Sequence, residues 1–278
     1  MMNRVKTGNA GRLVRAALLA VLLVLSFGMS TLAASNGWVK KKNYCYYYQN
    51  KKPVKGLQKI NGRTYYFDSK GIQRTSWRKI GKSYYCFNAE EKSGGYLLTN
   101  TTKNGIQIGP DGKADVRQKR PNRKVQVMVK VSHLLDKIMT KSKKTLSRKK
   151  KLKLCYDYLR KKYPYRLVSH FREKDPDFDL WSVEQLFKRH YADCVPYACT
   201  FAYLANALGY KDITILSWYI HKPRKTGHSW VQIGEKYYDV SLGRHNKKSF
   251  HLFSISKKKY KKIYPRYKIK NRKNIENL

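Results

Sequence analysis

The chain has 278 residues, which is enough for one sizeable hydrophobic core and a smaller module. It carries 61 Lys and Arg residues against 17 Asp and Glu residues, a formal net charge of +44, and such a field attracts polyanions without identifying one. Its five cysteines are scattered, which excludes a regular disulfide scaffold, and no Cys or His pair has the spacing of a structural zinc site. The sequence therefore predicts no metal and no cofactor.

The first 33 residues have the pattern of a secretory signal peptide. Four basic residues precede an apolar run over residues 16–27, which is too short to span a membrane comfortably as a permanent helix. Small residues at 31–33 suit a cleavage site. A retained signal anchor is the alternative. For a secreted protein we expect no dedicated nucleic-acid partner, and no transmembrane helix once the signal is removed.

Residues 35–115 are rich in aromatic residues, punctuated by glycine and repetitive. Gly-Trp, Gly-Leu and Ser-Trp dipeptides follow one another at spacings of 19 and 20 residues, and Tyr-Tyr-X triplets recur every 19 residues. Periods in this range indicate an array of small hairpins that bury their faces only against their neighbours. Either the rings form only the core of the array, or some of them also bind a ligand. The candidate ligand-binding residues are Trp38, Tyr46, Tyr47, Tyr65, Tyr66, Trp77, Tyr84 and Tyr85.

The segment at residues 60–71, Ile-Asn-Gly-Arg-Thr-Tyr-Tyr-Phe-Asp-Ser-Lys-Gly, resembles a unit of the choline- and glucan-binding repeats of Gram-positive surface proteins. In that family the aromatic residues stack between units and form cages for choline or sugars, and aromatic faces do attract quaternary ammonium ions. The resemblance implies cell-wall polymers as partners: teichoic acid, peptidoglycan, glucan or choline. Leu57 stands where the family's repeat has Trp, which weakens that unit as a ligand site.

A basic bridge, residues 116–145, follows the repeats. The charge pattern predicts a linker over residues 117–124, and apolar residues at helical spacing predict a helix over 125–139. Dense cationic runs occur at 141–153 and in the C-terminal tail, 257–278. Such runs are usually solvated faces. The alternative is a patch that binds wall polymers or membrane lipids. The tail is either disordered or an added anchor.

The stretch from Asp193 to Gly209 predicts a helix that begins at Cys194. Asp193 suits the N-cap, Pro196 is tolerated in the first turn, and Gly209 suits the left-handed residue that ends a helix. The positive end of a helix stabilises a thiolate, so Cys194 is a candidate nucleophile. A small buried thiol is the alternative.

Residues 228–240 predict a β-hairpin around a two-residue Gly-Glu loop. Counting back from the loop, Trp230 faces Asp239. His228 lies on the same face as Trp230, so Asp239 is its diagonal neighbour, with roughly 7 Å or less between Cβ atoms. With Cys194 these residues supply the nucleophile, base and orienting carboxylate of an activated thiol. Taken singly, the His and the Asp are more often polar residues at a strand's rim.

A cysteine that opens a helix ending at Gly, followed by His-Ser-Trp at 228–230 and Tyr-Asp at 238–239, resembles the transglutaminase-like superfamily over roughly residues 147–243. The resemblance implies an α+β fold with a papain-like transglutaminase core, in which helices pack on an antiparallel sheet. We place this catalytic domain at residues 146–256, after the small β-hairpin repeat module.

In the mechanism that the resemblance implies, His228 takes the proton of Cys194 and Asp239 orients the imidazole, so that the thiolate attacks an amide and forms a thioester. Water then gives a protease or amidase, which we favour, and an amine gives a cross-linker. We expect a peptide or protein substrate and a secreted protein associated with a Gram-positive cell wall. Asp193 replaces a small residue of many members and, unless it caps the helix, opposes thiolate formation. A non-catalytic wall- or polyanion-binding protein on the same fold is therefore the alternative.

Overall fold

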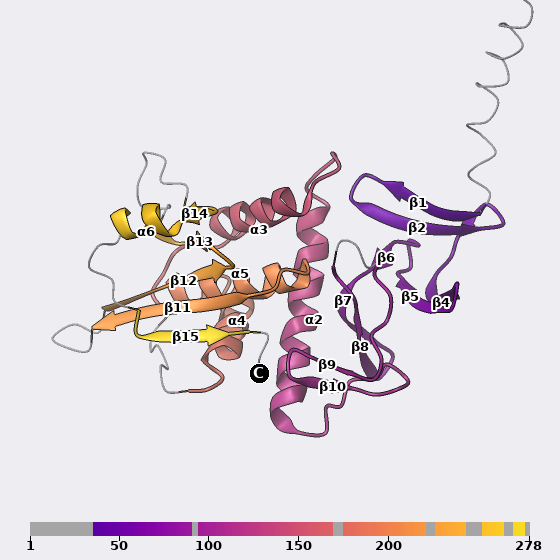
Figure 1. The fold of residues 1–278 in the computed structure, drawn as a ribbon, viewed down its shortest axis with the longest axis horizontal. Coiled ribbons are helices and arrows are strands. Elements are labelled where there is room, and N and C mark those ends of the chain that lie inside the picture. The colour runs from indigo at the N-terminus through magenta and orange to yellow at the C-terminus, as the bar shows by residue number, and fades with distance from the viewer. Residues whose placement is uncertain are drawn as a thin grey trace, which may run out of the picture.

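The structure is a computed structural model that describes residues 36–90, 94–168, 175–220, 226–242, 252–263 and 269–275. Within these residues the fold is mixed α/β, with small hairpins first and helices α2–α6 and an antiparallel sheet after them (Figure 1). The predicted fold class is confirmed, since hairpin units precede helices packed on an antiparallel sheet. The predicted signal peptide lies outside the described residues. No helix in the described ranges is both long and apolar enough to cross a bilayer.

Three hairpins of similar register open the described chain. The position held by Trp38 in the first hairpin is held by Leu57 in the second and by Trp77 in the third. A short third strand extends each of the first two hairpins. The strands are β1 (Gly37–Lys41), β2 (Tyr44–Gln49), β3 (Lys52–Pro53), β4 (Gly56–Ile60), β5 (Arg63–Phe67), β6 (Gln73–Arg74), β7 (Ser76–Ile80) and β8 (Ser83–Phe87).

The third hairpin is offset by one residue from the predicted repeat. The 19-residue period of the Tyr-Tyr-X triplets aligns Tyr84 with Tyr65, and this alignment is wrong. The strand registers make Tyr85 the equivalent of Tyr65, since each pairs with the third residue of the preceding strand. Ser76 opens the third hairpin with φ of +64°, in the place that Gly56 holds with φ of +72°. The extra residue therefore lies between the second and third hairpins, and the strand register within the two hairpins is the same.

Helix α2 (Lys119–Met139) begins earlier than the sequence predicts. The expected linker over residues 117–124 is wrong from residue 119 onward, because residues 119–124 form the first turns of the helix. Lys124 explains how so basic a stretch is accommodated. Its ammonium group donates to the backbone carbonyl of Asn104 at 2.5 Å, while its apolar stem is buried.

The third hairpin packs directly against α2. Asp136 of the helix pairs with Arg78 at 2.5 Å and with Arg74 at 3.1 Å. Trp77 is 1% exposed, and its indole N–H donates to the side-chain oxygen of Asn104 at 3.1 Å. This hairpin therefore belongs to the main core, whereas Ile60, Tyr65 and Phe67 of the second hairpin form a separate small cluster.

Helix α5 is the most enclosed element of the core. All of its residues except Val195 are buried, and it packs against α2, α3 and α4. It ends before Gly209, whose φ is +79° and where a Cβ would lie 2.4 Å from the backbone oxygen of Ala89. The predicted glycine terminus is thus confirmed. The remaining elements before the sheet are β9 (Thr101–Lys103), β10 (Ile106–Ile108), α3 (Arg148–Lys162), α4 (Phe178–Arg189) and α5 (Cys194–Ala207).

A five-stranded antiparallel sheet completes the core, in the order β14-β13-β12-β11-β15. Helix α5 covers one face. The other face carries a second apolar cluster, in which Trp230 and Tyr237 of the sheet meet Tyr260 of helix α6 (Lys257–Ile263). The strands are β11 (Ile213–Ile220), β12 (Thr226–Ile233), β13 (Lys236–Tyr238), β14 (Ile255–Ser256) and β15 (Asn271–Asn274).

The basic segment after residue 256 is part of this core. The sequence favours a disordered tail or an anchor over 257–278, and the structure contradicts this for residues 269–275. Strand β15 pairs with β11, Ile275 is fully buried, and Lys273 forms an ion pair with Asp179 at 3.0 Å. The strand was not predicted because the segment is rich in lysine. It forms nevertheless, since its pairing with β11 uses backbone groups, which side-chain charge does not affect.

Replacement of Trp77 by Ala should lower the free energy of unfolding by about 3–5 kcal/mol, because it empties a buried site and leaves the Asn104 oxygen unpaired. Trp38→Ala removes the equivalent ring of the first hairpin, which is 44% exposed, and should cost only about 1 kcal/mol. Urea unfolding of both variants measures the difference. Equal losses would contradict the assignment of only the third hairpin to the main core.

Candidate active site

Cys194 is the first residue of α5, as the sequence predicts. The side chain of Asp193 accepts a hydrogen bond from the backbone N–H of Val195 at 3.0 Å and so caps the helix. The Cys194 thiol is 6% exposed and lies 3.8 Å from the backbone oxygen of Gly227, on the strand that carries His228. The helix terminus therefore brings the thiol to the start of β12.

The carboxylate of Asp193 is fully used by backbone donors. One oxygen caps α5 and the other accepts from the N–H of Val168 at 2.8 Å. Burial raises the pKa of Asp193 above its ordinary value, and the hydrogen bonds from Val168 and Val195 oppose this shift. The sequence predicts that Asp193 opposes thiolate formation at Cys194 unless it caps the helix. In the structure the carboxylate of Asp193 is this cap. It also ties the 163–168 segment to the start of the helix.

His228 and Asp239 meet across the hairpin of β12 and β13. The observed register pairs Ile233 with Lys236 around Gly234 and Glu235, so the predicted loop is confirmed. Gly234 has φ of +52°, which suits the first position of a type II′ turn. The imidazole Nε2 lies 2.5 Å from Oδ2 of Asp239.

Asp239 is held from several directions. Its Oδ1 accepts from the backbone N–H of Ser241 at 3.1 Å, from the Ser241 hydroxyl at 3.0 Å and from the N–H of Leu242 at 3.0 Å. Its backbone carbonyl accepts from the Tyr156 hydroxyl of α3 at 2.7 Å, and its N–H donates to the Leu252 carbonyl at 2.8 Å. The carboxylate therefore has a fixed position from which to orient the imidazole.

The electrostatics of the buried pair favour an imidazolium opposite a carboxylate. Burial lowers the pKa of His228, but the charge and hydrogen bond of Asp239, with a further contribution from Cys194, outweigh it and raise this pKa well above its usual value. Burial likewise raises the pKa of Asp239, and the His228 charge with the hydrogen bonds just described brings it below its usual value. Because Nε2 faces Asp239, Nδ1 is the nitrogen left for the thiol.

An aromatic column supports the imidazole from behind. The ring of Trp230 stacks on that of His228 with centroids 5.7 Å apart, Tyr260 of α6 stacks on Trp230 at 5.2 Å, and Tyr237 stacks on Tyr260 at 4.9 Å. The sequence indicates Trp230 as part of the hairpin and of the His-Ser-Trp motif, but it gives no sign of Tyr260, which lies in a segment with the pattern of a basic tail. The column fixes the plane of the His228 ring.

Tyr165 is a second residue whose place at the site the sequence did not assign. Its ring stacks on Tyr197 in the first turn of α5 at 6.4 Å, and a parallel bridge to Ala192 fixes its backbone. Burial raises its pKa, and the neighbouring Cys194 and Asp193 add to this shift. In the sequence, the Tyr-Pro-Tyr turn at 163–165 was the signal that could have indicated Tyr165. The bridge to Ala192, two residues before Cys194, is what places Tyr165 near the start of α5.

The eight aromatic residues predicted to bind a ligand do not form one site. Trp38 lies against Tyr47 at 5.3 Å, against Tyr65 at 4.9 Å and against Phe67 at 5.9 Å, which makes one cluster between the first two hairpins. Trp77 is buried against α2, so its prediction as a ligand contact is contradicted: no face of the ring is open. The others lie apart, with Tyr66 stacked on Phe87, Tyr84 under Lys79, Tyr46 beside Tyr48 and Tyr85 bridged to Lys113.

Comparison with known families matches two separate parts of the chain to two different families. Residues 132–239 match the model of the Transglutaminase-like superfamily, and residues 54–101 match that of a choline-binding repeat. The chain joins a choline-binding repeat to a transglutaminase-like region. The family recognised from the sequence motifs is therefore confirmed, and Cys194, His228 and Asp239 all lie within the transglutaminase-like match.

Several solved structures similar to part of the chain are choline-binding proteins of Streptococcus pneumoniae. One is a choline binding domain with 26% identity, covering 30% of this chain and 98% of the other, with a TM-score of 0.27. Choline binding protein F, solved in the presence of a peptidoglycan analogue, has 26% identity, covers 28% of this chain and 33% of its own, and has a TM-score of 0.20. CbpJ has 25% identity, coverage of 29% and 34%, and a TM-score of 0.21. No match was found among curated proteins.

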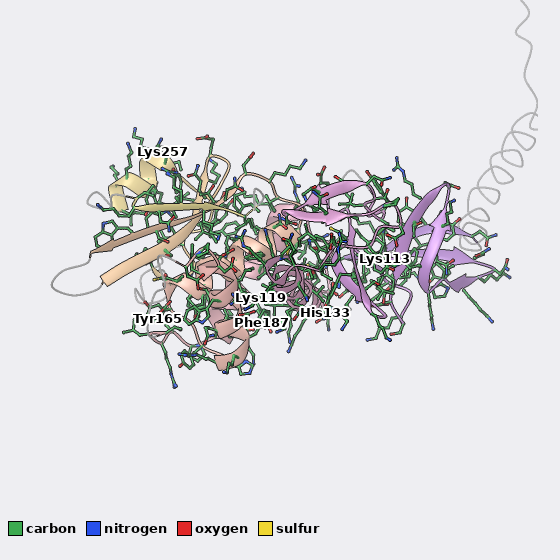
Figure 2. All side chains as sticks on the ribbon, turned by 90° about the horizontal axis from the view of Figure 1, so that it is seen from below. Lys113, Lys119, His133, Tyr165, Phe187 and Lys257 are labelled. Atoms are coloured by element: carbon green, nitrogen blue, oxygen red, sulfur yellow. The ribbon has the colours of Figure 1, made fainter. Side chains whose placement is uncertain are left out.

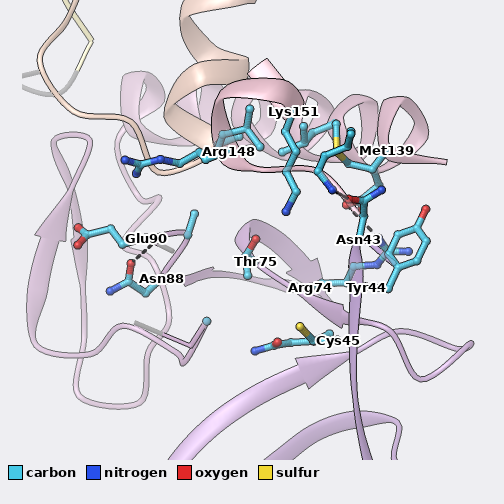
Figure 3. A pocket seen from close by; sticks show the side chains of 18 of the residues that line it. Asn43, Tyr44, Cys45, Arg74, Thr75, Asn88, Glu90, Met139, Arg148 and Lys151 are labelled. Carbon is cyan, nitrogen blue, oxygen red and sulfur yellow. Dashed lines mark hydrogen bonds and ion pairs between the residues drawn. The ribbon is translucent and has the colours of Figure 1, made fainter. Parts of the chain in front are cut away.

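A polar pocket of about 250 Å³ lies outside the transglutaminase-like site, between the hairpins and helices α2 and α3 (Figure 3). Its lining includes Leu208, so it is at the opposite end of α5 from Cys194. Three of its polar side chains are already engaged: Arg74 pairs with Asp136, and the side chain of Asn43 bonds backbone groups of residues 144 and 146. The pocket therefore lies where the hairpin segments meet helices α2 and α3. In the described residues no group of three or more His, Cys, Asp or Glu side chains is arranged to hold a metal ion.

The His228–Asp239 pair should make stability depend on pH. The raised pKa of His228 means that its contribution is complete below about pH 6.5 and is lost as pH rises through the folded pKa. The lowered pKa of Asp239 means that its contribution is complete above about pH 4 and is lost as pH falls through the folded pKa. The melting temperature of His228→Gln should therefore fall furthest below that of the wild type between about pH 4 and 6.5.

His133 of α2 is a control of opposite sign, because burial lowers its pKa. The wild type should lose stability relative to His133→Gln as pH falls below about 6.5. A melting-temperature deficit of His228→Gln that does not change with pH would contradict the charged pair.

Proposed function

We propose that the protein is a secreted, cell-wall-associated thiol enzyme that hydrolyses amide bonds in peptides through a thioester on Cys194. One observation carries the proposal: the thiol at the start of α5 lies 3.8 Å from the backbone oxygen of Gly227, the residue before His228, and the His228 imidazole is hydrogen-bonded to the Asp239 carboxylate at 2.5 Å. The match to the transglutaminase-like superfamily supports cysteine-based chemistry at these residues. The match to a choline-binding repeat supports a place at the cell surface.

The first half of the reaction transfers the acyl group to sulfur. The thiol proton passes to His228, which accounts for the imidazolium that the raised pKa of His228 favours, and Sγ of Cys194 attacks the amide carbonyl carbon. The carbonyl oxygen becomes an oxyanion, for which the backbone N–H of Cys194 at the helix start is the proposed donor. His228 then gives its proton to the amide nitrogen, the C–N bond breaks, and the amine leaves. Asp239 keeps the imidazole oriented and stabilises its charge throughout.

The second half releases the acyl group. His228 takes a proton from water, the hydroxide forms a bond to the thioester carbon, and the C–S bond breaks to give a carboxylic acid product. The sulfur recovers its proton from His228. An amine in place of water would give a new amide, which is the cross-linking outcome. We propose hydrolysis, and a fluorescent primary amine offered as a second acceptor separates the two: incorporation into protein would overturn the hydrolytic assignment.

A non-catalytic binding protein is the second candidate. The observation that favours it is the small exposure of the Cys194 thiol, 6%, together with a carboxylate immediately before it. In this version the repeats and the net charge of +44 hold the protein to wall polymers, and the transglutaminase-like region binds a partner without turnover.

Alkylation by iodoacetamide at about pH 6 distinguishes the two candidates. We expect Cys194 to react at least about tenfold faster than Cys45, a half-buried thiol without a His partner that serves as an internal control. His228→Ala should bring Cys194 down to the rate of Cys45. The other three thiols should stay unlabelled because burial raises the pKa of Cys86 to about 12 and also raises those of Cys155 and Cys199. Equal rates for Cys194 and Cys45, unchanged in His228→Ala, would reject the enzyme in favour of the binding protein.

The cluster of Trp38, Tyr47 and Tyr65 is the proposed site for choline. Trp38→Ala should weaken binding about tenfold or more, because the loss of one ring opens the cage to water. The strand registers make Leu57, Tyr66 and Tyr85 the equivalent set one hairpin later, so Leu57→Trp should add a second site. Calorimetric titration with choline measures both changes. Retained affinity in Trp38→Ala would contradict this site, and an unchanged stoichiometry in Leu57→Trp would contradict the equivalence.

A further inference from the structure

Helix α6 presents lysine to the solvent on every side but one. Its sequence is Lys-Lys-Lys-Tyr-Lys-Lys-Ile over residues 257–263, and all five lysines are exposed while Tyr260 is buried. Seven residues span only about 10 Å. Figure 2 places Lys257 at the end of the molecule opposite the hairpins.

These charges are not neutralised by the protein. In the ranges that the structure describes, none of the five lysines forms an ion pair, and the sequence contains no Asp or Glu between residues 240 and 275. Lys257 and Lys261, like Lys258 and Lys262, are like charges at i and i+4, an arrangement that destabilises a helix. Folding gains nothing from this composition, so an external anion is the natural counter-charge.

The helix is nevertheless held in a defined position. So short a helix is unstable alone, and here Tyr260 anchors it by stacking between Trp230 and Tyr237 of the sheet. The same column continues to the His228 ring. The lysines are therefore presented by a fixed support next to the candidate active site and far from the aromatic cluster on the first hairpins.

We propose that α6 is a docking surface for a polymer with repeated phosphate groups. The lysine ammonium is a compact charge on a flexible stem, which suits successive phosphates without requiring one fixed bidentate geometry. The helix has no Arg and no exposed aromatic ring, so it lacks the groups that read or stack nucleic-acid bases. It also has no exposed apolar face to insert into a bilayer, because Tyr260 and Ile263 pack into the sheet cluster.

This site goes beyond the proposed amide chemistry and does not depend on it. The repeats would hold a cationic group at one end of the molecule, and α6 a chain of phosphates at the other. A wall polymer that carries both would thus be oriented with its phosphates beside the transglutaminase-like site.

The test is binding of the full chain to inorganic polyphosphate at several salt concentrations, in a Cys194→Ala background so that catalysis plays no part. One variant replaces the five α6 lysines by Gln. The matched control replaces five exposed lysines of the hairpins by Gln: Lys51, Lys52, Lys55, Lys59 and Lys82. We expect the α6 variant to lose about tenfold or more in affinity and its log–log salt slope to fall by about 3, while the control changes by less than about threefold.

A third variant with Arg at the five α6 positions keeps the charge and should keep the binding. Equal losses in the Gln variant of α6 and in the hairpin control would show that net charge alone attracts the polymer, and would overturn the site. So would unchanged affinity in the α6 variant. Binding to phosphatidylglycerol vesicles but not to polyphosphate, lost in the α6 variant, would replace the polymer by a membrane surface.

Discussion

The side-chain amide of Asn104 is the point at which the separate parts of the chain are joined. Its oxygen accepts from Trp77 of the third hairpin, and its nitrogen donates to Asn206 of α5 at 3.3 Å and to the Ile275 carbonyl at 3.5 Å. Its backbone carbonyl accepts from Lys124 of α2, whose pKa burial lowers to about 8. With three partners on its buried side-chain amide and a fourth on its backbone carbonyl, Asn104 is fixed in place, because any displacement leaves a polar group unpaired. The orientation of α5, and so of Cys194, depends on it.

Four acidic residues of this cationic chain hold parts of the fold in place. Asp136 joins a hairpin to α2, Asp193 caps the helix of the thiol, and Asp239 orients the imidazole. Asp179 accepts from the Tyr203 hydroxyl at 2.7 Å and pairs with Lys273, which fastens the last strand to α4. With 17 acids against 61 bases, almost any surface carboxylate would find a cation without specificity. Asp179, Asp193 and Asp239 are buried, so their partners cannot be exchanged for water, whereas the partly exposed Asp136 is held by two arginines.

Local patterns in the sequence predicted the elements that depend on neighbours in the chain. The helix start at Cys194 and the loop after Ile233 were predicted correctly because capping and turn chemistry are local. The failures arose where tertiary contacts decide. Lys124 read as linker because only the Asn104 carbonyl, distant in sequence, makes a buried lysine tolerable. Tyr260 read as tail because its stacking partners lie on strands outside its segment.

The contact between Asn104 and Ile275 spans 171 positions of sequence and sets an order of assembly. Each hairpin pairs strands a few residues apart and can form as soon as it is synthesised. The contacts that join the two halves cannot be completed until residue 275 is present, since β15 completes the sheet and Ile275 completes the partners of Asn104. The first two hairpins can therefore fold against one another during synthesis, while the half that carries the thiol stays unassembled until its last strand is made.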